Sequence, residues 1–338
     1  MPGDKQRAEL CDWLILSTGL LHAIPDKYRD YRKVVHDGVR FLLMNISKER
    51  FAKLLAEQLT LSNVSMHKRL ITLAKEFPTL HKLGQIVARN RNIDPQFRRW
   101  LITLEHDTTK NIIPPEIIKH INLPPHIKIG NNIIAEASVG VVVPFYTKEG
   151  EGIKGVLKIL KPNIVDILNE EMAILDRLGV YFHENREKYP LKDFRFIETF
   201  KDIKEGLLSE IDLLGEQQHL RTAKIFYDEM DYIKIPEVYD FSTKDMTAME
   251  FIDGNRITES ELSTEEKKWV AEKLFASIIG LPLFSTLDKT IFHGDPHGGN
   301  VFITKEGGEI KIALLDWSLT GRLTKEQRAN ILRLSLSI

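Results

Sequence analysis

Two segments decide the fold: HGDPHGGN at residues 293–300 and IKIALLD at residues 310–316. An aspartate followed five residues later by an asparagine lets a carboxylate orient a hydroxyl or water and accept its proton. The side-chain amide of the asparagine can then turn back and bind a metal ion that is also bound by phosphate groups. An aspartate at the end of the next strand supplies a second oxygen ligand. We therefore expect Asp295 to be catalytic and Asn300 and Asp316 to bind the metal; the alternative is a Gly/Asp-rich turn before a buried strand.

The same order of residues, H-x-D-x-x-x-x-N and then a strand-ending aspartate, is typical of the catalytic region of protein kinases. Such a site requires a lysine in the middle of an upstream strand, and Lys158 in VLKI fits this requirement. The lysine needs a carboxylate partner on a helix, for which Glu216 is the candidate. Taken alone, the two residues would instead indicate an exposed edge strand and a solvated acidic helix face.

A phosphate-covering loop and a hinge that meets the nucleotide base should flank this lysine. Residues 135–140, AEASVG, stand where a glycine-rich loop is expected, and their alanines predict a stiffer loop. MEFI at residues 249–252 fits a hinge at a strand end, although a buried strand end is the alternative. The candidate nucleotide-binding residues, besides Lys158, are Ala135, Ala137, Ser138, Met249, Glu250 and Ile252.

The pattern of the chain predicts an α+β fold, with two kinase-like lobes after an all-helical extension. We expect residues 1–125 to be the extension, 126–254 the first lobe and 255–338 a short second lobe. Helices are predicted over about 165–186 and 200–227, the latter holding Glu210, Asp212 and Glu216. Capping boxes predict helix starts at Ser263–Glu266 and Thr324–Gln327. Further predictions are a helix start at Asp94–Pro95 and an apolar face formed by Phe51, Leu54, Leu55 and Leu59.

Composition excludes several classes of protein. The chain has 338 residues, 43% hydrophobic, and a net charge of −1, which is ordinary for a globular protein without a bulk attraction to nucleic acid. A single cysteine, Cys11, excludes an internal disulfide framework. No apolar run is long enough to span a membrane, and we expect residues 274–287 to form a buried helix and turn. We expect the N-terminal segment to be a helix packed on the protein, and the alternative is peripheral membrane contact through Trp13, Leu14 and Leu16.

Beyond these patterns, the sequence resembles the UbiB/ADCK family of atypical kinases from about Leu73 to Leu323. The resemblance rests on five motifs in order, of which Lys82-Leu-Gly84-Gln85 is the most specific, since it is similar to the K-x-G-Q motif of the family. The others are the alanine-rich loop, Glu210-Ile-Asp212 as an E-x-D motif, the HGD loop and the strand-ending aspartate. Lys82, Gly84, Gln85, Glu210 and Asp212 are therefore expected to be regulatory.

The resemblance implies an ATP- and Mg²⁺-dependent atypical kinase or ATPase. In this family the K-x-G-Q segment packs over the active site, with Lys82 and Gln85 near the nucleotide and the E-x-D residues. That arrangement favours ATPase activity or small-molecule phosphorylation over protein phosphorylation. The family is linked to ubiquinone and other isoprenoid-lipid metabolism. The implied partners are a nucleotide, a lipid or isoprenoid-phenol ligand and a membrane surface, but no nucleic acid, in a cytoplasmic or membrane-associated protein.

The sequence departs from the family pattern in three places, and two alternatives stay open. The loop has HGGN where HPGN is usual, Asp316-Trp317-Ser318 replaces Asp-Phe-Gly, and Glu136 stands where an alanine is common. Loss of the glycine removes a flexible point next to the metal aspartate. A nucleotide-binding pseudokinase or scaffold is one alternative. An aminoglycoside-type small-molecule phosphotransferase is the other, because its HGD loop has the same pattern.

Overall fold

The computed structural model describes residues 4–336 except 62, 90–94, 96–97, 99–112, 120, 149–151 and 192. The predicted helix start at Asp94–Pro95 lies outside the described residues. The chain forms two compact units. The first contains Met1–Thr109, Glu136–Val139 and Lys161–Leu208, and the second contains Lys110–Ala135, Gly140–Leu160 and Ser209–Ile338. The helices that follow Lys161 thus pack with the N-terminal helices, and the three-part division of the chain stays a prediction.

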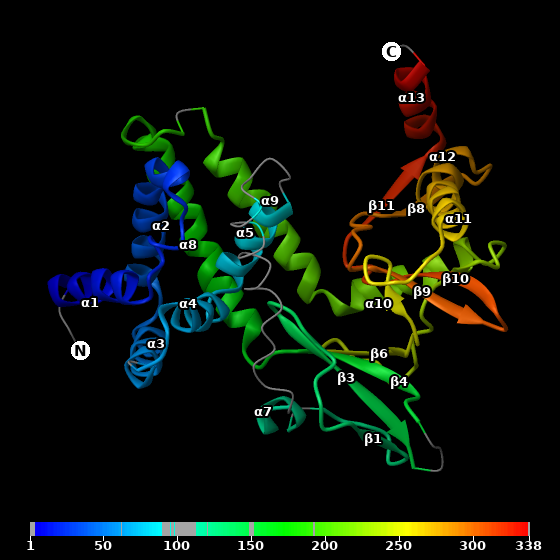
Figure 1. Ribbon diagram of the computed structural model, residues 1–338, viewed down its shortest axis with the longest axis horizontal. Helices are drawn as coiled ribbons and strands as arrows, with labels where there is room; N and C mark the ends of the chain where they lie inside the picture. The colour runs from blue at the N-terminus through cyan, green and yellow to red at the C-terminus, as the bar shows by residue number, and fades with distance from the viewer. Residues whose placement is uncertain are drawn as a thin grey trace. The chain divides into compact units, whose positions relative to one another are not determined.

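The first unit is mainly helical (Figure 1). On the third of its helices Phe51 and Leu54 are buried as expected, but Leu59 is exposed. The buried position on that face is taken by Gln58, whose Nε2 donates to the Arg69 carbonyl at 3.1 Å. The elements are α1 (Asp4–Ser17), η1 (Asp26–Tyr31), α2 (Arg32–Asn45), α3 (Lys48–Thr60), α4 (Met66–Lys75), α5 (Pro78–Arg89), α8 (Ile164–Glu184), η2 (Arg186–Lys188) and α9 (Phe196–Ile211).

A buried ion-pair cluster joins three of these helices. Arg50 on α3 contacts Glu171 on α8, and its Nη1 lies 3.0 Å from Oε2 of Glu170. Glu171 accepts two further hydrogen bonds at Oε2, from the backbone N (3.0 Å) and the Oγ1 (2.6 Å) of Thr79 at the start of α5. We call Arg50, Thr79, Glu170 and Glu171 the Arg50 cluster. It fixes the start of the helix that carries the K-x-G-Q segment.

The second unit begins with an antiparallel sheet in the order β1-β3-β4-β6, with β2 paired to β3. The β-branched run of β3 explains the strand, and the core under the sheet includes Val143, Leu157 and Ala248. The register places Lys158 between Val142 and Thr247. The strands are β1 (Ile127–Ile129), β2 (Ala135–Glu136), β3 (Gly140–Thr147), β4 (Gly155–Leu160) and β6 (Met246–Glu250).

A second sheet, in the order β5-β10-β9-β7, and a two-stranded sheet of β8 and β11 complete this unit. The tight turn between β9 and β10 has positive φ at both Gly307 and Gly308, as such hairpins require. Asp295 follows β8 and Asp316 follows β10. These strands are β5 (Ile233–Lys234), β7 (Asn255–Arg256), β8 (Lys289–His293), β9 (Val301–Glu306), β10 (Glu309–Leu314) and β11 (Thr320–Thr324).

Two helices of the second unit begin at the capping boxes that the sequence predicts. Ser263 and Glu266 form the expected capping box, with bonds of 2.7 and 3.2 Å. Thr324 and Gln327 cap the last helix in the same way. The helices are α7 (Pro115–Ile118), α10 (Leu213–Phe226), α11 (Thr264–Phe275), the π-helix η3 (Ala276–Gly280), α12 (Leu281–Phe284) and α13 (Lys325–Leu336).

The single helix predicted over 200–227 is wrong, because the chain breaks at Asp212. Asp212 has φ −81° and ψ 71°, and its Oδ1 accepts from the backbone N of Gly215 at 2.9 Å, so it caps α10. A Cβ at Gly215 would lie 2.3 Å from Oδ2 of Asp212. Glycine at this position therefore makes room for the cap, and Asp212 and Glu216 do not share one continuous helix with Glu210.

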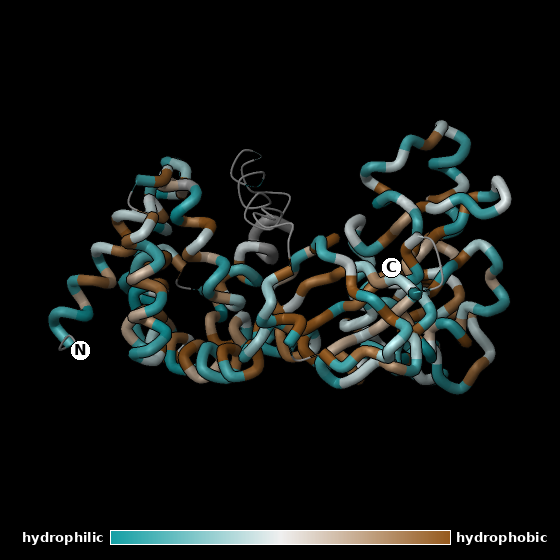
Figure 2. The backbone as a smooth tube through the Cα atoms, turned by 90° about the horizontal axis from the view of Figure 1, so that it is seen from below, coloured by the Kyte–Doolittle hydropathy of each residue, from teal (hydrophilic) through white to brown (hydrophobic). Residues whose placement is uncertain are grey.

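No helix among the described residues is both long and apolar enough to cross a membrane. Figure 2 shows hydrophobic and hydrophilic residues alternating along the backbone. The expectation that residues 274–287 are buried is wrong in part, because Phe275 and Phe284 are exposed at the ends of α11 and α12. Leu14 is fully buried and belongs to the core, whereas Trp13 is 38% exposed and Leu16 is 61% exposed.

Candidate active site

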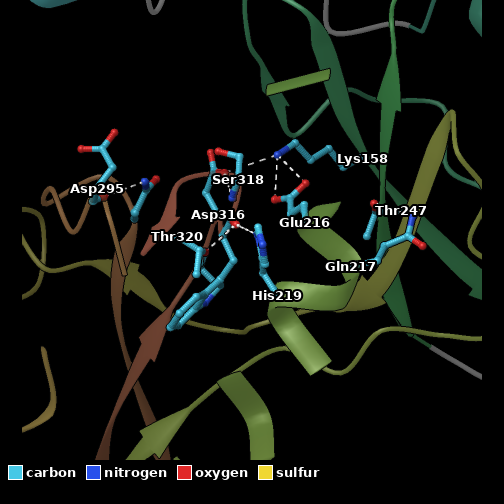
Figure 3. Close-up of polar contacts among 12 residues, drawn as sticks. Lys158, Glu216, Gln217, His219, Thr247, Asp295, Asp316, Ser318 and Thr320 are labelled. Carbon is cyan, nitrogen blue, oxygen red and sulfur yellow. Dashed lines mark hydrogen bonds and ion pairs between the residues drawn. The ribbon is translucent and has the colours of Figure 1, made fainter. Parts of the chain in front are cut away.

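Lys158, Glu216 and Asp316 come together in the second unit, and we call them the Lys158 cluster (Figure 3). Nζ of Lys158, on β4, lies 2.8 and 2.9 Å from the two carboxylate oxygens of Glu216 on α10. It lies 3.5 Å from Oδ1 of Asp316, which follows β10. Residues far apart in the sequence thus meet at one ammonium group, as the sequence predicts for this lysine and its helical partner.

The position of α10 beside the sheet depends on a residue that the sequence did not single out. Nε2 of Gln217 donates to Oγ1 of Thr247 at 3.1 Å and to the carbonyl of Thr243 at 2.8 Å. Thr247 is the β6 residue directly opposite Lys158 in the register. Gln217 therefore ties the helix that carries Glu216 to the strand next to the lysine.

Burial and charge shift the pKa values of all three groups in the Lys158 cluster. Burial raises the pKa of Glu216 to about 7, although the neighbouring Lys158 opposes this. Burial would lower the pKa of Lys158, but the charges of Asp316, Glu216 and Glu210 outweigh it and raise the pKa. Burial would raise the pKa of Asp316, yet Lys158 and hydrogen bonds from Ser318 hold it well below its ordinary value. At neutral pH, Lys158 is positive and Asp316 negative.

The loop that carries Asp295 is fastened to the segment before Asp316 through a histidine ring. Nε2 of His293 donates to the carbonyl of Leu315 at 2.8 Å, and Nδ1 accepts from the backbone N of Asp295 at 3.1 Å. Nδ2 of Asn300 donates to the carbonyl of Asp295 at 3.1 Å, and the backbone N of Leu315 donates to the Asn300 carbonyl at 2.8 Å. The two segments of sequence that decide the fold are thus bonded to each other.

The donor set around this loop fits a magnesium ion. Because Nδ2 of Asn300 is used by the Asp295 carbonyl, its Oδ1 is the side-chain atom left to act as a ligand. Asp316 contributes a negatively charged carboxylate that is 41% exposed. Oxygen ligands of this kind suit Mg²⁺, which also keeps waters and phosphate oxygens in its coordination shell. Within the described residues there is no group of three or more His, Cys, Asp or Glu side chains that could hold a metal.

The alanine-rich segment forms an ion pair with the residue that follows β4. Oε1 of Glu136 lies 2.9 Å from Nζ of Lys161, so its charge is paired. Ala135 and Glu136 form β2, Ala137 follows it, and Ser138 is buried. The backbone N of Lys161 donates to the Val139 carbonyl at 2.9 Å. Contact of Ala135, Ala137 and Ser138 with a nucleotide stays a prediction.

The proposed hinge forms the end of β6, next to β4. Met249 pairs with Val156 and Glu250 with Gly155. The carboxylate of Glu250 lies 2.9 Å from Nζ of Lys234, so this side chain is engaged beside the strand. Ile252 is buried. The backbone of this segment thus borders the strand that carries Lys158, and its contact with an adenine base stays a prediction.

The regulatory candidates fall in both units. Lys82 is buried on α5 in the first unit, and a Cβ at Gly84 would meet no other heavy atom of the described residues within 4 Å outside its own helix backbone and chain neighbours. Gln85 also belongs to α5, but its side chain lies outside the described residues. In the second unit, Glu210 is close enough to raise the pKa of Lys158, and Asp212 caps α10. The predicted approach of Lys82 and Gln85 to the E-x-D residues stays a prediction.

Besides Gln217, two residues beside the site escaped sequence reasoning. Nδ1 of His219 contacts the carbonyl of Trp317 at 3.0 Å, and the backbone N of Ser318 donates to Oδ1 of Asp316 at 3.3 Å. The signal for His219 was its spacing, since it stands one helical turn after Glu216. Ser318 was noted only as a departure from glycine.

Comparison with known proteins identifies the family of this chain. The ABC1 atypical kinase-like domain matches residues 125–338. A probable protein kinase UbiB from Sodalis glossinidius is 29% identical over 202 residues, which cover 58% of this chain and 35% of the relative. Another from Yersinia pestis is 26% identical over 345 residues, which cover 97% of this chain and 59% of the relative. The chain thus spans less than two thirds of the length of these curated relatives.

Among solved structures, the complex of Rv3197 with erythromycin from Mycobacterium tuberculosis is similar over 83% of this chain and 69% of that chain, with 16% identity and a TM-score of 0.49. The domain match confirms the resemblance drawn from the five motifs, and with it the two-lobed, protein-kinase-like α+β fold. The chain belongs to the ABC1 atypical kinase-like family.

Proposed function

We propose that this protein is an ATP- and Mg²⁺-dependent atypical kinase or ATPase of the UbiB type. One observation carries the proposal: Nζ of Lys158 lies between the carboxylates of Glu216 and Asp316, at 2.8 and 3.5 Å. A protein-kinase-like site needs this lysine–glutamate pair and a metal-binding aspartate beside it.

The charges of the Lys158 cluster favour a metal-dependent reaction. One ammonium faces two acidic side chains, and the negative Asp316 already balances its charge, so the cluster on its own offers no surplus positive charge to the phosphates of a nucleotide. Asn300 and Asp316 are the residues that would hold Mg²⁺, which when bound neutralises phosphate charge. Lys158, kept in place by Glu216, donates to the α- and β-phosphates.

Asp295 is the residue that would orient the attacking group. Its backbone N donates to His293 and its carbonyl accepts from Asn300, so the backbone that carries the carboxylate is held on both sides. Asp295 would accept a hydrogen bond from a substrate hydroxyl or a water and take its proton as the oxygen bonds to the γ-phosphorus of ATP. The bond from that phosphorus to the β–γ bridging oxygen breaks in the same reaction, and ADP is the leaving group. The same geometry serves a kinase with a hydroxyl acceptor and an ATPase with water.

The finer part of the proposal concerns the acceptor. We place the protein in isoprenoid-lipid, ubiquinone-like metabolism, on the basis of the family resemblance and of relatives named probable protein kinase UbiB. A lipid or isoprenoid-phenol is the proposed ligand. The exposed Trp13 and Leu16 on α1 are the proposed membrane contacts, since an indole and a leucine suit the lipid–water interface.

A nucleotide-binding scaffold is the second candidate. The observation that favours it is the Asp316–Trp317–Ser318 segment, which lacks the usual glycine. Such a protein would bind Mg²⁺–ATP without turning it over.

ATP turnover tests the proposal. We would compare the wild type with Asp316→Asn and with Asp228→Asn, a matched change at an exposed position. Each would be measured with and without anionic liposomes that contain an isoprenoid phenol. We expect turnover in the wild type and in Asp228→Asn, and a loss of at least about 100-fold in Asp316→Asn. Equal rates in all three contradict the proposal, and Mg²⁺-dependent binding without turnover selects the scaffold.

A further inference from the structure

The side chain of Trp317, directly after the proposed metal-binding aspartate, is held in the core of the second unit. It is 0% exposed, and its Nε1 donates to the carbonyl of Leu314 at 3.1 Å. The ring of His293 packs edge-on at a centroid distance of 4.8 Å, and Tyr227 lies at 6.0 Å. An indole of this size leaves such a core only at a large cost in apolar burial.

The backbone of Trp317 is held as well. Its carbonyl accepts from Oγ1 of Thr320 at 3.0 Å and contacts Nδ1 of His219 at the same distance (Figure 3). Because a carbonyl can only accept, Nδ1 of His219 must carry the proton. His219 stands one turn after Glu216 on α10, so the helix that fixes Lys158 also fixes the residue after Asp316.

Asp316 itself has a backbone geometry that needs such support. Its φ is 55°, in the left-handed region that non-glycine residues rarely adopt. Two positions later, Ser318 stands where the family pattern has a glycine, so the segment lacks the backbone freedom that a glycine would give. The strained residue is therefore stabilised by what holds Trp317.

We propose that His219, Trp317 and Thr320 form a latch that holds Asp316 in one conformation, whether or not a nucleotide is bound. Its consequence for Mg²⁺ rests on the proposed function. His219 acts as a positioning residue, since it touches the backbone beside Asp316 and not the carboxylate. The latch makes the site preorganised, in contrast to a kinase whose metal motif moves between two states.

Fluorine NMR of protein labelled with 5-fluorotryptophan tests the latch directly. The chain has four tryptophans, and the resonance of Trp317 is identified by its loss in Trp317→Phe. We expect one sharp Trp317 resonance in the nucleotide-free protein, and still one after addition of Mg²⁺ and a non-hydrolysable ATP analogue. Two Trp317 resonances without nucleotide, of which the analogue selects one, would overturn the latch.

Variants at His219 separate a positioning role from a merely structural one. His219→Leu removes the donor, and we expect a second or broadened Trp317 resonance and about tenfold weaker Mg²⁺-dependent binding of the analogue. His219→Asn keeps an N–H close to the position of Nδ1 and should restore both readouts. Gln218→Leu, at the exposed neighbouring position, is the matched control. No change of either readout in His219→Leu overturns the proposal.

The two readouts also distinguish this proposal from the proposed function. The resonance of the nucleotide-free protein needs no ligand, so it decides the state of the latch by itself. A single Trp317 resonance in a protein that binds no Mg²⁺–nucleotide supports the latch and contradicts the proposed function.

Discussion

The Arg50 cluster in the first unit and the Lys158 cluster in the second each join one cation to two carboxylates. In the Arg50 cluster, Glu171 is 0% exposed and its second oxygen is met by the backbone and the hydroxyl of Thr79. In the Lys158 cluster, the carboxylate of Asp316 is 41% exposed. Both clusters combine one basic side chain with two acidic ones, but the first cluster is closed and the second is open.

This difference suits a structural role for the closed cluster and the proposed binding role for the open one. At Glu171, the backbone N–H and the hydroxyl of Thr79 stabilise the carboxylate together with Arg50, so this cluster needs no further cation. At Asp316 the surplus charge faces solvent, where a cation can meet it. The first cluster should therefore matter mainly for stability and the second mainly for the reaction, and the following predictions test that contrast.

The largest effect is expected from Lys158→Met, which removes the only cation of the Lys158 cluster. We expect ATP turnover to fall by about 100-fold to 1000-fold, because a preorganised charge at the phosphates is lost. Measured rates of the variant and of Lys154→Met, an exposed lysine, give the comparison. A rate within threefold of the wild type would contradict the role of Lys158.

The converse change is Glu171→Gln in the Arg50 cluster. It removes one of the two negative charges beside the buried Arg50 guanidinium. We therefore expect the free energy of unfolding in urea to fall by about 3 kcal/mol. Glu170→Gln, at a position that is partly exposed, should cost less than half as much. A loss below about 0.5 kcal/mol in Glu171→Gln would mean that the closed cluster does not stabilise the unit.

A third prediction concerns pH and the histidine next to the open cluster. Burial lowers the pKa of His293 below 6.5, and its Nδ1 accepts a hydrogen bond that a protonated ring cannot accept. The contribution of His293 to stability is therefore complete above pH 6.5 and is lost as the pH falls below it, by at most about 1.4 kcal/mol per pH unit. Unfolding free energies of the wild type and of His293→Asn should converge between pH 6.5 and 5. A difference that stays constant over this range contradicts the prediction.

The smallest effect is expected from Asp212→Ala, which removes the cap of α10 but no member of either cluster. Loss of an N-cap costs about 1 kcal/mol of stability. Urea unfolding would measure it, with Asp228→Ala near the other end of the helix as the control. If both substitutions cost the same, the helix break at Asp212 is not held by its side chain.

Much of the candidate site could be predicted because a kinase-like reaction needs particular residue types at particular spacings. Asp295, Asn300 and Asp316 stand at loop and strand ends whose spacing few other sites require, and Lys158 with Glu216 followed from the same scheme. The break at Asp212 could not be predicted from periodicity, because apolar residues continue on both sides of it. Its signal was local: an aspartate three residues before a glycine.

The Arg50 cluster and the latch lay beyond sequence reasoning for a physical reason. Arg50 and Glu171 are separated by 121 positions, and no local pattern encodes such a pair. His219 contacts a backbone carbonyl, which every residue has, so its partner leaves no trace in the sequence. At Leu59 a local pattern was present but misleading. Helical spacing predicted that Leu59 is buried, whereas Gln58 takes the buried position.

The central claim is that the open cluster binds Mg²⁺ together with ATP, and calorimetry tests it most directly. A non-hydrolysable ATP analogue would be titrated into the wild type and Asp316→Asn, each with and without Mg²⁺. The account predicts binding to the wild type that requires Mg²⁺, and a loss of that Mg²⁺ dependence in a folded Asp316→Asn variant. Equal affinities in all four titrations would contradict it.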